Sequence, residues 1–521
     1  MKYLFKSAII LLLVGHWGTA LSQSVSTPKN ISMGGGGTTY ITGFEANFIN
    51  PANLMIRERA SNRSIGIGTV SGFYNPVMPG KSSLEQAKMY RDFWDAYRPG
   101  SLPLNSATRD QLLDRNYKND RRISEHQHRS DAILAGLKLQ KGDQTFSLTA
   151  RIRNATRIEV GRGWYDEQYI QADSDNGMNI REMSLVQQSQ FLYEFSFGYA
   201  QPFDFVNGLI PRLGKLYIGI APKFIIGGSY MNLQYDAQYW FTNEMDQPRF
   251  TRSMSYASAG SYSEATSYFK NNNDAAGAIQ NFFPSSYLQN YGAYTEPSGY
   301  GGGFDFGLTY VLSLGDDLSL AGQKGDGILE KSLRIGFSVT DLGFISYNQH
   351  PLSLTQSNDT LLTDIISEAN TQFEGRPGQY LTFLSASGDP VNPLYNEGET
   401  SELTENREIF TTILPTTFNA GMLLQVDKLL LSADLTIGLN DTAFNNTKLM
   451  AHFGMEFRPL STIPIRLGTQ IAAGYPTLWT AGTGIETRRW DFSIGAQFLT
   501  KNKSVTPEFS GGAVGMFTYH F

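Results

Sequence analysis

The chain of 521 residues contains no cysteine. This absence excludes a disulfide framework, thiol chemistry and a lipid anchor on cysteine. Charged residues are also few, at 17% of the chain, and 42 Lys and Arg against 48 Asp and Glu give a mildly acidic balance. No basic block or stripe is available to neutralise phosphates, so nucleic acid is not an expected partner.

The sequence also lacks an apolar run long enough to cross a bilayer as a helix, which takes about 20 residues. The apolar stretch 8–14 follows Lys2 and Lys6 and precedes the small residues Ala20 and Ser22. This pattern predicts a secretory signal peptide over residues 1–22. An exported chain without such a helix can span a membrane only as a closed β-barrel, because an open sheet edge would leave backbone groups unpaired in lipid.

Glycine and aromatic residues are abundant, with 52 Gly, 33 Phe and 27 Tyr. Near the C-terminus, apolar and polar residues alternate with the period of two that places one set toward lipid and the other toward the lumen. The predicted outward residues include Phe453, Leu467 and Ile494. The predicted inward or rim residues form a candidate lumen polar network of His452, Glu456, Arg458, Arg466, Gln470, Arg489 and Asp491.

The final residues GGAVGMFTYHF read as a strand that ends on an aromatic residue. Phe517, Tyr519 and Phe521 fall on one face, and the same alternation would continue it through Gly515 and Ala513. Closing a barrel against its first strand would require such a terminal strand. The aromatic pattern resembles the signal read by the outer-membrane barrel assembly machinery, which implies that machinery as a partner, and outer-membrane lipid as the surroundings of the barrel.

Counting further segments predicts an all-β, membrane-spanning antiparallel barrel of about 14 strands over residues 63–521. Strands include 131–140, 188–201, 409–424 and 511–521. Long connections are expected at 74–130, 159–187, 240–299 and 348–408, and short turns alternate with them. Short turns belong on the periplasmic side, so the outer-membrane location places both termini in the periplasm.

Residues 23–62 precede the first strand and have neither a strand nor a helix period. The run Met33 to Gly37, containing Gly34, Gly35, Gly36 and Gly37, is followed by EANFINPANL with Asn50 and Pro51. This segment resembles the N-terminal hatch of the FadL-like long-chain fatty acid transporter superfamily, which also includes a type IX secretion component. FSVTDLGFISYN and LPTTFNAGMLLQV look like the same group. The resemblance implies a hatch inside the lumen and, in transporting members, a lateral opening caused by a kinked strand.

Sharper chemical motifs are weak. EHQH offers His126 and His128 without an evident third ligand, so a solvated loop is expected and no metal site is predicted. His452 and Ser493 lack a triad partner in register, so no enzyme activity and no cofactor are expected. The loop segment 84–100 has helical spacing and would form either a helix packed on the barrel mouth or an extracellular lid.

Two functions remain open at this stage. The first is a passive outer-membrane channel for hydrophobic small molecules, with the hatch as its gate around Gly34 to Gly37, Asn50 and Pro51. The second is a non-transporting barrel that serves as a structural or interaction partner in a secretion or surface-display complex. A channel predicts an apolar path past the hatch, whereas a partner barrel predicts a lumen sealed by charge pairs such as Arg458 with Glu456.

Overall fold

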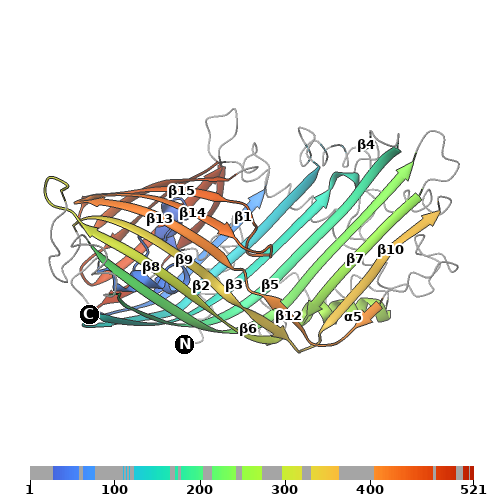
Figure 1. Ribbon diagram of the computed structural model, residues 1–521, viewed down its shortest axis with the longest axis horizontal. Helices are drawn as coiled ribbons and strands as arrows, with labels where there is room; N and C mark the ends of the chain where they lie inside the picture. The colour runs from blue at the N-terminus through green and yellow to red at the C-terminus, as the bar shows by residue number, and fades with distance from the viewer. Residues whose placement is uncertain are drawn as a thin grey trace.

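The computed structural model describes residues 27–57, 63–76, 110, 113, 117, 122–164, 171–173, 178–203, 214–241, 249–272, 296–319, 330–362, 404–472, 477–499, 508–515 and 517–521. These residues form a closed antiparallel barrel that encloses an N-terminal segment, with part of its wall extended far beyond the barrel (Figure 1). No helix among the described residues is long and apolar enough to cross a membrane.

The barrel wall contains 14 strands, if the last two pieces are counted as one strand. Each strand pairs with the next, and the last strand pairs with the first, so the described wall has no open edge at barrel level. In order, the strands are β1 (Arg63–Pro76), β2 (Ile123–Lys141), β3 (Gln144–Gly161), β5 (Met178–Pro202), β6 (Lys215–Phe241), β8 (Gly299–Ser313), β9 (Lys331–Tyr347), β13 (Thr417–Val426), β14 (Leu429–Gly438), β15 (Met450–Leu460), β16 (Ile463–Ala472), β17 (Leu478–Glu486), β18 (Trp490–Leu499), and β19 (Glu508–Val514) with β20 (Phe517–His520).

The predicted alternation along the strands is confirmed. Phe453, Leu467 and Ile494 are among the exposed apolar side chains on the outer wall, and every barrel strand contributes at least one such residue. The inner positions are polar or small, as in the burial pattern of β16. A closed barrel with an apolar outer band and a polar lumen is what a bilayer requires of a strand-built span.

The two ends of the barrel differ, as the alternating connections predict. The tight turns β2–β3, β13–β14 and β15–β16 gather at one end, which we name the turn end, and Phe521 reaches it by donating its backbone N–H to the Arg63 carbonyl. The connections β1–β2, β6–β8 and β9–β13 leave from the opposite end, which we name the loop end. The alternation that was inferred from connection lengths is therefore present in the fold.

Several predicted loops contain strands. β6 pairs with β8 within the barrel and with β7 (Arg249–Ala259) at the loop end. β7 in turn pairs with β10 (Leu352–Leu362), and β10 pairs with β11 (Thr404–Asn406). Together with the long β2, β3 and β5, these strands build the wall extension at the right of Figure 1, beside helix α5 (Ser261–Asn272). The predicted connections 159–187, 240–299 and 348–408 were thus wrong in part, and β5 starts ten residues before the predicted strand 188–201.

Three smaller predictions also need correction. His126 and His128 lie within β2 and not in a loop. The predicted strand 409–424 is divided into β12 (Phe410–Ile413) and β13, both paired with β9. The predicted connection 74–130 is shorter than expected because β1 runs to Pro76 and β2 begins at Ile123. The candidate helix at 84–100 lies outside the described residues.

The last strand is interrupted at Gly515, which has φ +92°. Ala513 is buried against Ile31, whereas Phe517 faces outward, so the predicted single face from Ala513 to Phe521 was wrong. The facing β1 changes sides in the same way at Gly68, where φ is +82°, and β2 carries an irregularity at Leu134. Glycine adopts these φ values at little cost. The three neighbouring strands change face at the same level, at Gly68, Leu134 and Gly515, and we name this feature the seam.

Candidate functional site: the hatch and the sealed lumen

The N-terminal segment 27–57 fills the barrel near the turn end (Figure 1). It contains the short helix α2 (Pro28–Ser32), capped by the Thr27 hydroxyl, and the 3-10 turns η1 (Phe44–Phe48) and η2 (Pro51–Met55). Within this hatch, Met33, Tyr40, Phe48 and Leu54 are fully buried. A segment with no strand or helix period folds here because the surrounding wall supplies the partners that regular hydrogen bonding would otherwise provide.

The glycine run turns the hatch sharply beside the neighbouring strands β14, β15 and β16. Gly34, Gly35 and Gly37 have φ of +85°, +91° and +140°, which a side chain would disfavour. Gly36 has ordinary φ, but a Cβ there would collide with the Asp434 carboxylate. The sequence therefore needs four glycines for two different reasons, backbone conformation at three positions and space at the fourth.

Two side chains of neighbouring strands hold the ends of this run. His452 on β15 donates from Nδ1 to the Gly34 carbonyl at 2.7 Å. Asp434 on β14 accepts from the Thr38 N–H at 3.0 Å. The wall side chains thus bind backbone groups of the hatch. Because His452 contacts Gly34, it does not belong to the Glu456 cluster in which the sequence analysis placed it.

Asn50 and Pro51 begin η2 and join it to the wall. The Asn50 side chain caps the turn by accepting from the Ala52 N–H, and its amide donates to the Thr38 carbonyl at 2.8 Å and to Thr309 Oγ1 on β8 at 2.9 Å. Pro51 occupies the first position of the turn, where its missing N–H costs nothing. Asn50 therefore joins the two halves of the hatch to each other and to β8.

Replacing Asn50 with alanine is expected to lower the free energy of unfolding by about 1–3 kcal/mol, because the Thr38 carbonyl and Thr309 lose a buried donor. Urea unfolding of the purified barrel in detergent would measure the change. The matched control is Asn406→Ala on exposed β11, which should change stability by less than about 0.5 kcal/mol. Equal stability of the two variants would contradict the assigned role of Asn50.

A ring of wall glycines accommodates the hatch. At each of these positions a Cβ would come within 3.0 Å of a hatch atom, and ten of the eleven form cross-strand pairs. The pairs are Gly66 with Gly136, Gly219 with Gly307, Gly336 with Gly421, Gly454 with Gly468 and Gly482 with Gly495, and the remaining member is Gly198. We name this ring the glycine girdle. It brings the hatch backbone into direct contact with strands around the wall.

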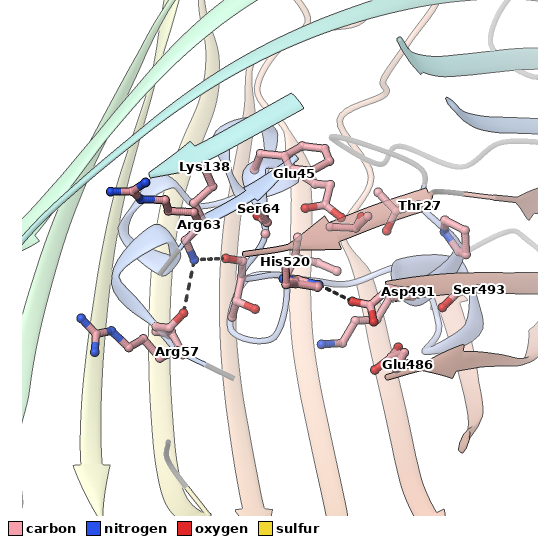
Figure 2. A pocket seen from close by; sticks show the side chains of 18 of the residues that line it. Thr27, Glu45, Arg57, Arg63, Ser64, Lys138, Glu486, Asp491, Ser493 and His520 are labelled. Atoms are coloured by element: carbon pink, nitrogen blue, oxygen red, sulfur yellow. Dashed lines mark hydrogen bonds and ion pairs between the residues drawn. The ribbon is translucent and has the colours of Figure 1, made fainter. Parts of the chain in front are cut away.

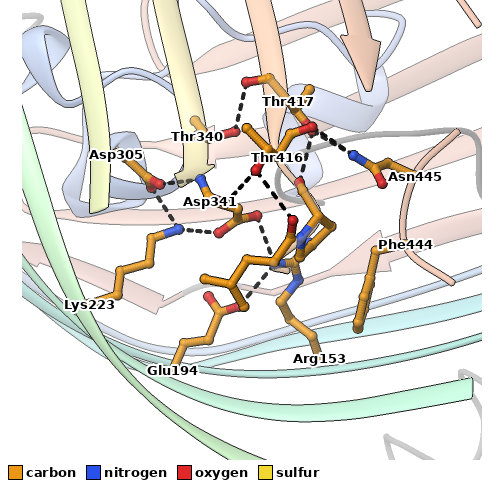
Figure 3. A network of polar contacts seen from close by, with 12 residues as sticks. Arg153, Glu194, Lys223, Asp305, Thr340, Asp341, Thr416, Thr417, Phe444 and Asn445 are labelled. Atoms are coloured by element: carbon orange, nitrogen blue, oxygen red, sulfur yellow. Dashed lines mark hydrogen bonds and ion pairs between the residues drawn. The ribbon is translucent and has the colours of Figure 1, made fainter. Parts of the chain in front are cut away.

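A layer of buried charges closes the lumen on the loop side of the hatch (Figure 3). Arg153 Nη1 lies 2.9 Å from both Glu194 Oε1 and Asp341 Oδ2, and Lys223 Nζ lies 2.7 Å from Asp305 Oδ2. Four basic and four acidic side chains, each at most 2% exposed, make up this charge layer: Arg129, Asp131, Arg151, Arg153, Glu194, Lys223, Asp305 and Asp341. Their balance of charge permits burial that an unpaired ion would not tolerate.

Aromatic rings cover the charge layer on both sides. On the hatch side, the Arg151 guanidinium lies 3.9 Å from the centre of the Phe48 ring. On the other side, Phe444 of the β14–β15 connection packs over Arg153, with the centre of its ring 4.4 Å from the guanidinium carbon. Farther toward the loop end, Tyr230, Tyr347 and Phe410 stack at 4.8–5.6 Å. The described lumen is therefore sealed along its axis by charges and rings, with no continuous apolar path through its centre.

The predicted polar network is divided in the structure. Glu456, Arg458 and Arg466 lie together near the turn end with Glu486, linked by distances of 2.6–2.7 Å. Gln470 is buried beside Met450, and Asp491 pairs with His520 at 2.7 Å. Arg489 is exposed outside β18 and does not face the lumen. The aromatic residues of the predicted assembly signal project outward, with Phe517 and Phe521 exposed and Tyr519 against Trp490.

The sequence reasoning missed the charge layer. Its signal was the alternation of Arg151 and Arg153 with Ala150 and Ile152, which places two cations on one face of a membrane strand. A further charged group lies toward the loop end of β3, where Arg157 pairs with Glu159 and with Asp441 of the β14–β15 connection. Burial raises the pKa of Glu159, and the neighbouring Arg157 guanidinium opposes that shift.

A small cavity of about 130 Å³ lies at the turn end between the hatch and the wall (Figure 2). Gly43 and Phe44 of the hatch line it on one side, and Ser64, Lys138 and Gly515 of the wall on the other. Lys138 Nζ donates to the carbonyls of Thr42 at 2.6 Å and Ile56 at 3.4 Å. The cavity adjoins the seam, because Gly515 belongs to both.

The fold and the sealed lumen define a membrane-spanning β-barrel of the outer-membrane type with an internal hatch. The architecture implied by the FadL-like resemblance is thereby confirmed. Residues 82–496 match the family described as "Family of unknown function (DUF5723)", and the chain belongs to that family. No curated protein matches the chain.

Solved structures whose backbone is similar to that of this chain include the toluene transporter TodX of P. putida. The TM-score is 0.41, with 10% sequence identity over 96% of this chain and 99% of that one. The monoaromatic hydrocarbon channel CymD gives a TM-score of 0.40 and 11% identity over 96% and 99%. The Ralstonia pickettii toluene transporter TbuX gives 0.37 and 12% over 96% and 99%. Similarity this low assigns no function to the chain.

Proposed function

We propose that this protein is a passive outer-membrane channel for hydrophobic small molecules, with the N-terminal hatch as its gate. The turn end faces the periplasm, in keeping with the short periplasmic turns of bacterial barrels. The observation that carries the proposal is the seam. Gly68, Leu134 and Gly515 interrupt three adjacent strands beside the hatch, at the level where a cavity meets the wall.

The charge layer limits the route that such a channel can use. Moving an apolar solute along the axis would require it to pass Arg153, Glu194 and Lys223, each buried and held in an ion pair within the charge layer. Separating these ions inside the barrel would leave charges uncompensated at a cost of several kcal/mol. The proposed path therefore runs between the hatch and the wall at the seam and exchanges solute with the membrane there.

Proteoliposomes that contain the purified protein provide the test. An apolar aromatic solute should equilibrate across the membrane faster than in protein-free vesicles, whereas a sugar of similar size should not, because the charge layer closes the axis. Solute entry is followed by stopped-flow fluorescence quenching. Equal rates for vesicles with and without protein would refute the channel.

A variant of the seam sharpens that test. Gly68→Ala places a side chain at φ +82°, which costs about 1–2 kcal/mol and favours regular pairing of β1. We expect apolar flux to fall several-fold while the barrel stays folded. Gly302→Ala, on β8 and away from the seam, is the matched control, since its nearest atom would be the Lys223 carbonyl at 3.5 Å. Unchanged flux in Gly68→Ala would exclude the seam from the path.

A second candidate function is a non-transporting partner in an outer-membrane complex. The wall extension favours it, because β7, β10 and β11 build a sheet beyond the barrel that solute passage does not require. The sealed axis is also what this function predicts. Mild detergent extraction from the native membrane followed by mass spectrometry would find a stoichiometric protein partner if this function holds, and an enriched apolar ligand if the channel does.

A further inference from the structure

The hatch meets the glycine girdle in two different ways. At Gly454, Gly468 and Gly495 the colliding hatch atoms would include backbone atoms, such as the Met33 carbonyl at 2.7 Å from a Cβ on Gly454 and the Pro28 carbonyl at 2.7 Å from one on Gly495. Gly219 faces the backbone of Pro51 and Ala52 in the same manner. At these positions the hatch backbone packs directly on the strand backbone. Separating the two would require the whole hatch segment to move, so we treat these contacts as immobile.

At Gly66 and Gly136 the hatch contributes only the ring of Phe44. Two hatch side chains at other girdle positions, Asn47 and Asn50, are held by hydrogen bonds. Asn47 donates to Thr149 at 3.2 Å, and Asn50 donates to Thr309 at 2.9 Å. A phenyl ring has no such tie and is retained by packing alone, so rotation about its side-chain bonds leaves no buried polar group without a partner.

The backbone on either side of this ring is anchored. Lys138, two residues beyond Gly136 on β2, donates to the Thr42 and Ile56 carbonyls. Thr149 on β3 donates to the Phe44 carbonyl at 3.3 Å. The ring can therefore turn while the chain that carries it stays in place, which is the mechanical condition for a hinged seal.

Phe44 also lies on a boundary. It lines the cavity at the turn end together with Gly43, Ser64 and Gly515. It belongs at the same time to the buried apolar cluster that contains Ile133 of β2. Ile133 directly precedes Leu134 at the seam. The ring thus lies between the cavity at the turn end and Ile133 of β2, next to the Leu134 irregularity of the seam.

We propose that Phe44 is the movable seal of the hatch, and that rotation of its ring off Gly66 and Gly136 opens a passage beside β1 and β2 while the remaining hatch stays fixed to the wall. This inference rests on the proposed channel function and specifies its gate. The passage that one ring vacates admits an alkyl chain or a single aromatic ring and excludes wider or hydrated solutes. Ejection of the hatch plays no part.

The absence of cysteine makes a direct test available. A single Ile133→Cys thiol lies beyond Phe44 as seen from the cavity, and its labelling rate by N-ethylmaleimide reports opening of the seal. We expect Phe44→Ala to raise that rate about tenfold, because labelling follows the open population. Phe48→Ala is the matched control, a hatch phenylalanine of equal size under Arg151 that touches no girdle glycine, and it should leave the rate within about twofold.

Folding of each variant is checked by its heat-modifiable migration on gels. If Phe44→Ala does not fold, Gly136→Ala serves instead, because a Cβ at that position displaces the ring and should also accelerate labelling. Equal labelling in the Phe44 and Phe48 variants would overturn the proposal. Faster labelling without apolar flux in any variant would support the seal and refute the channel, so the two failures are distinguishable.

Discussion

Replacing Gly468 with alanine is expected to prevent the barrel from reaching its folded state, or to lower its free energy of unfolding by about 3 kcal/mol or more. A Cβ there would meet the Met33 carbonyl carbon at 2.5 Å and the Phe453 carbonyl oxygen at 2.8 Å. Both are backbone atoms, one of the hatch and one of the neighbouring strand. Neither can move without disrupting the girdle or the β15–β16 pairing.

The measurement for Gly468→Ala is the amount of heat-modifiable protein in the outer membrane, followed by urea unfolding of whatever folds. Gly302→Ala provides the comparison, since it also adds one methyl group to a barrel glycine but meets only an ordinary contact at 3.5 Å. If both variants accumulate and unfold alike, the girdle does not hold the hatch as described.

Replacing Arg153 with methionine is expected to destabilise the protein by about 3–5 kcal/mol, because it removes one partner from a buried ion network. The side chain keeps much of its volume, while Glu194 and Asp341 lose their bonds at 2.9 Å. Adding Asp341→Asn should recover part of the loss by removing one uncompensated charge. The double variant separates the effect of charge from that of packing.

Equilibrium unfolding in urea would measure these differences for the Arg153 variants. Arg407→Met is the control, since its ion pair with Glu405 at 2.7 Å is exposed and should contribute no more than about 1 kcal/mol. Comparable losses for the buried and the exposed arginine would contradict a sealed lumen. A rise in sugar permeability of Arg153→Met vesicles would show that the layer also excludes polar solutes.

The sequence was most informative where one physical requirement acts on every residue of a strand. Phe453 and Leu467 face lipid because a bilayer admits little else, and the period of two shows it directly. The seam escaped prediction because period two gives no sign of which glycine takes positive φ, so Ala513 was assigned to the wrong face. The strand β7 was read as loop because, beyond the membrane, neither face of a strand has to be apolar.

The candidate site was predictable in location and not in its contacts. The Gly34 to Gly37 run and Asn50 marked the hatch through the resemblance to the FadL-like superfamily, while the glycines themselves indicated only tight backbone turns. Which wall residues contact them depends on the strand register around the whole barrel, and no local sequence pattern gives that register. For this reason the contact of His452 with the Gly34 carbonyl, and the pairing of Glu456 with arginines alone, were not predicted. The charge layer joins β2, β3, β5, β6, β8 and β9, so no local pattern contains all of it.

The glycine girdle constrains the order of events during biogenesis. Contacts in which Gly454 and Gly468 press on the hatch backbone leave no gap through which a folded hatch could enter a finished barrel. The hatch must then be in place before β19 and β20 close against β1, so the barrel strands assemble around it. The hatch precedes every described strand in the chain, which suits that order of events.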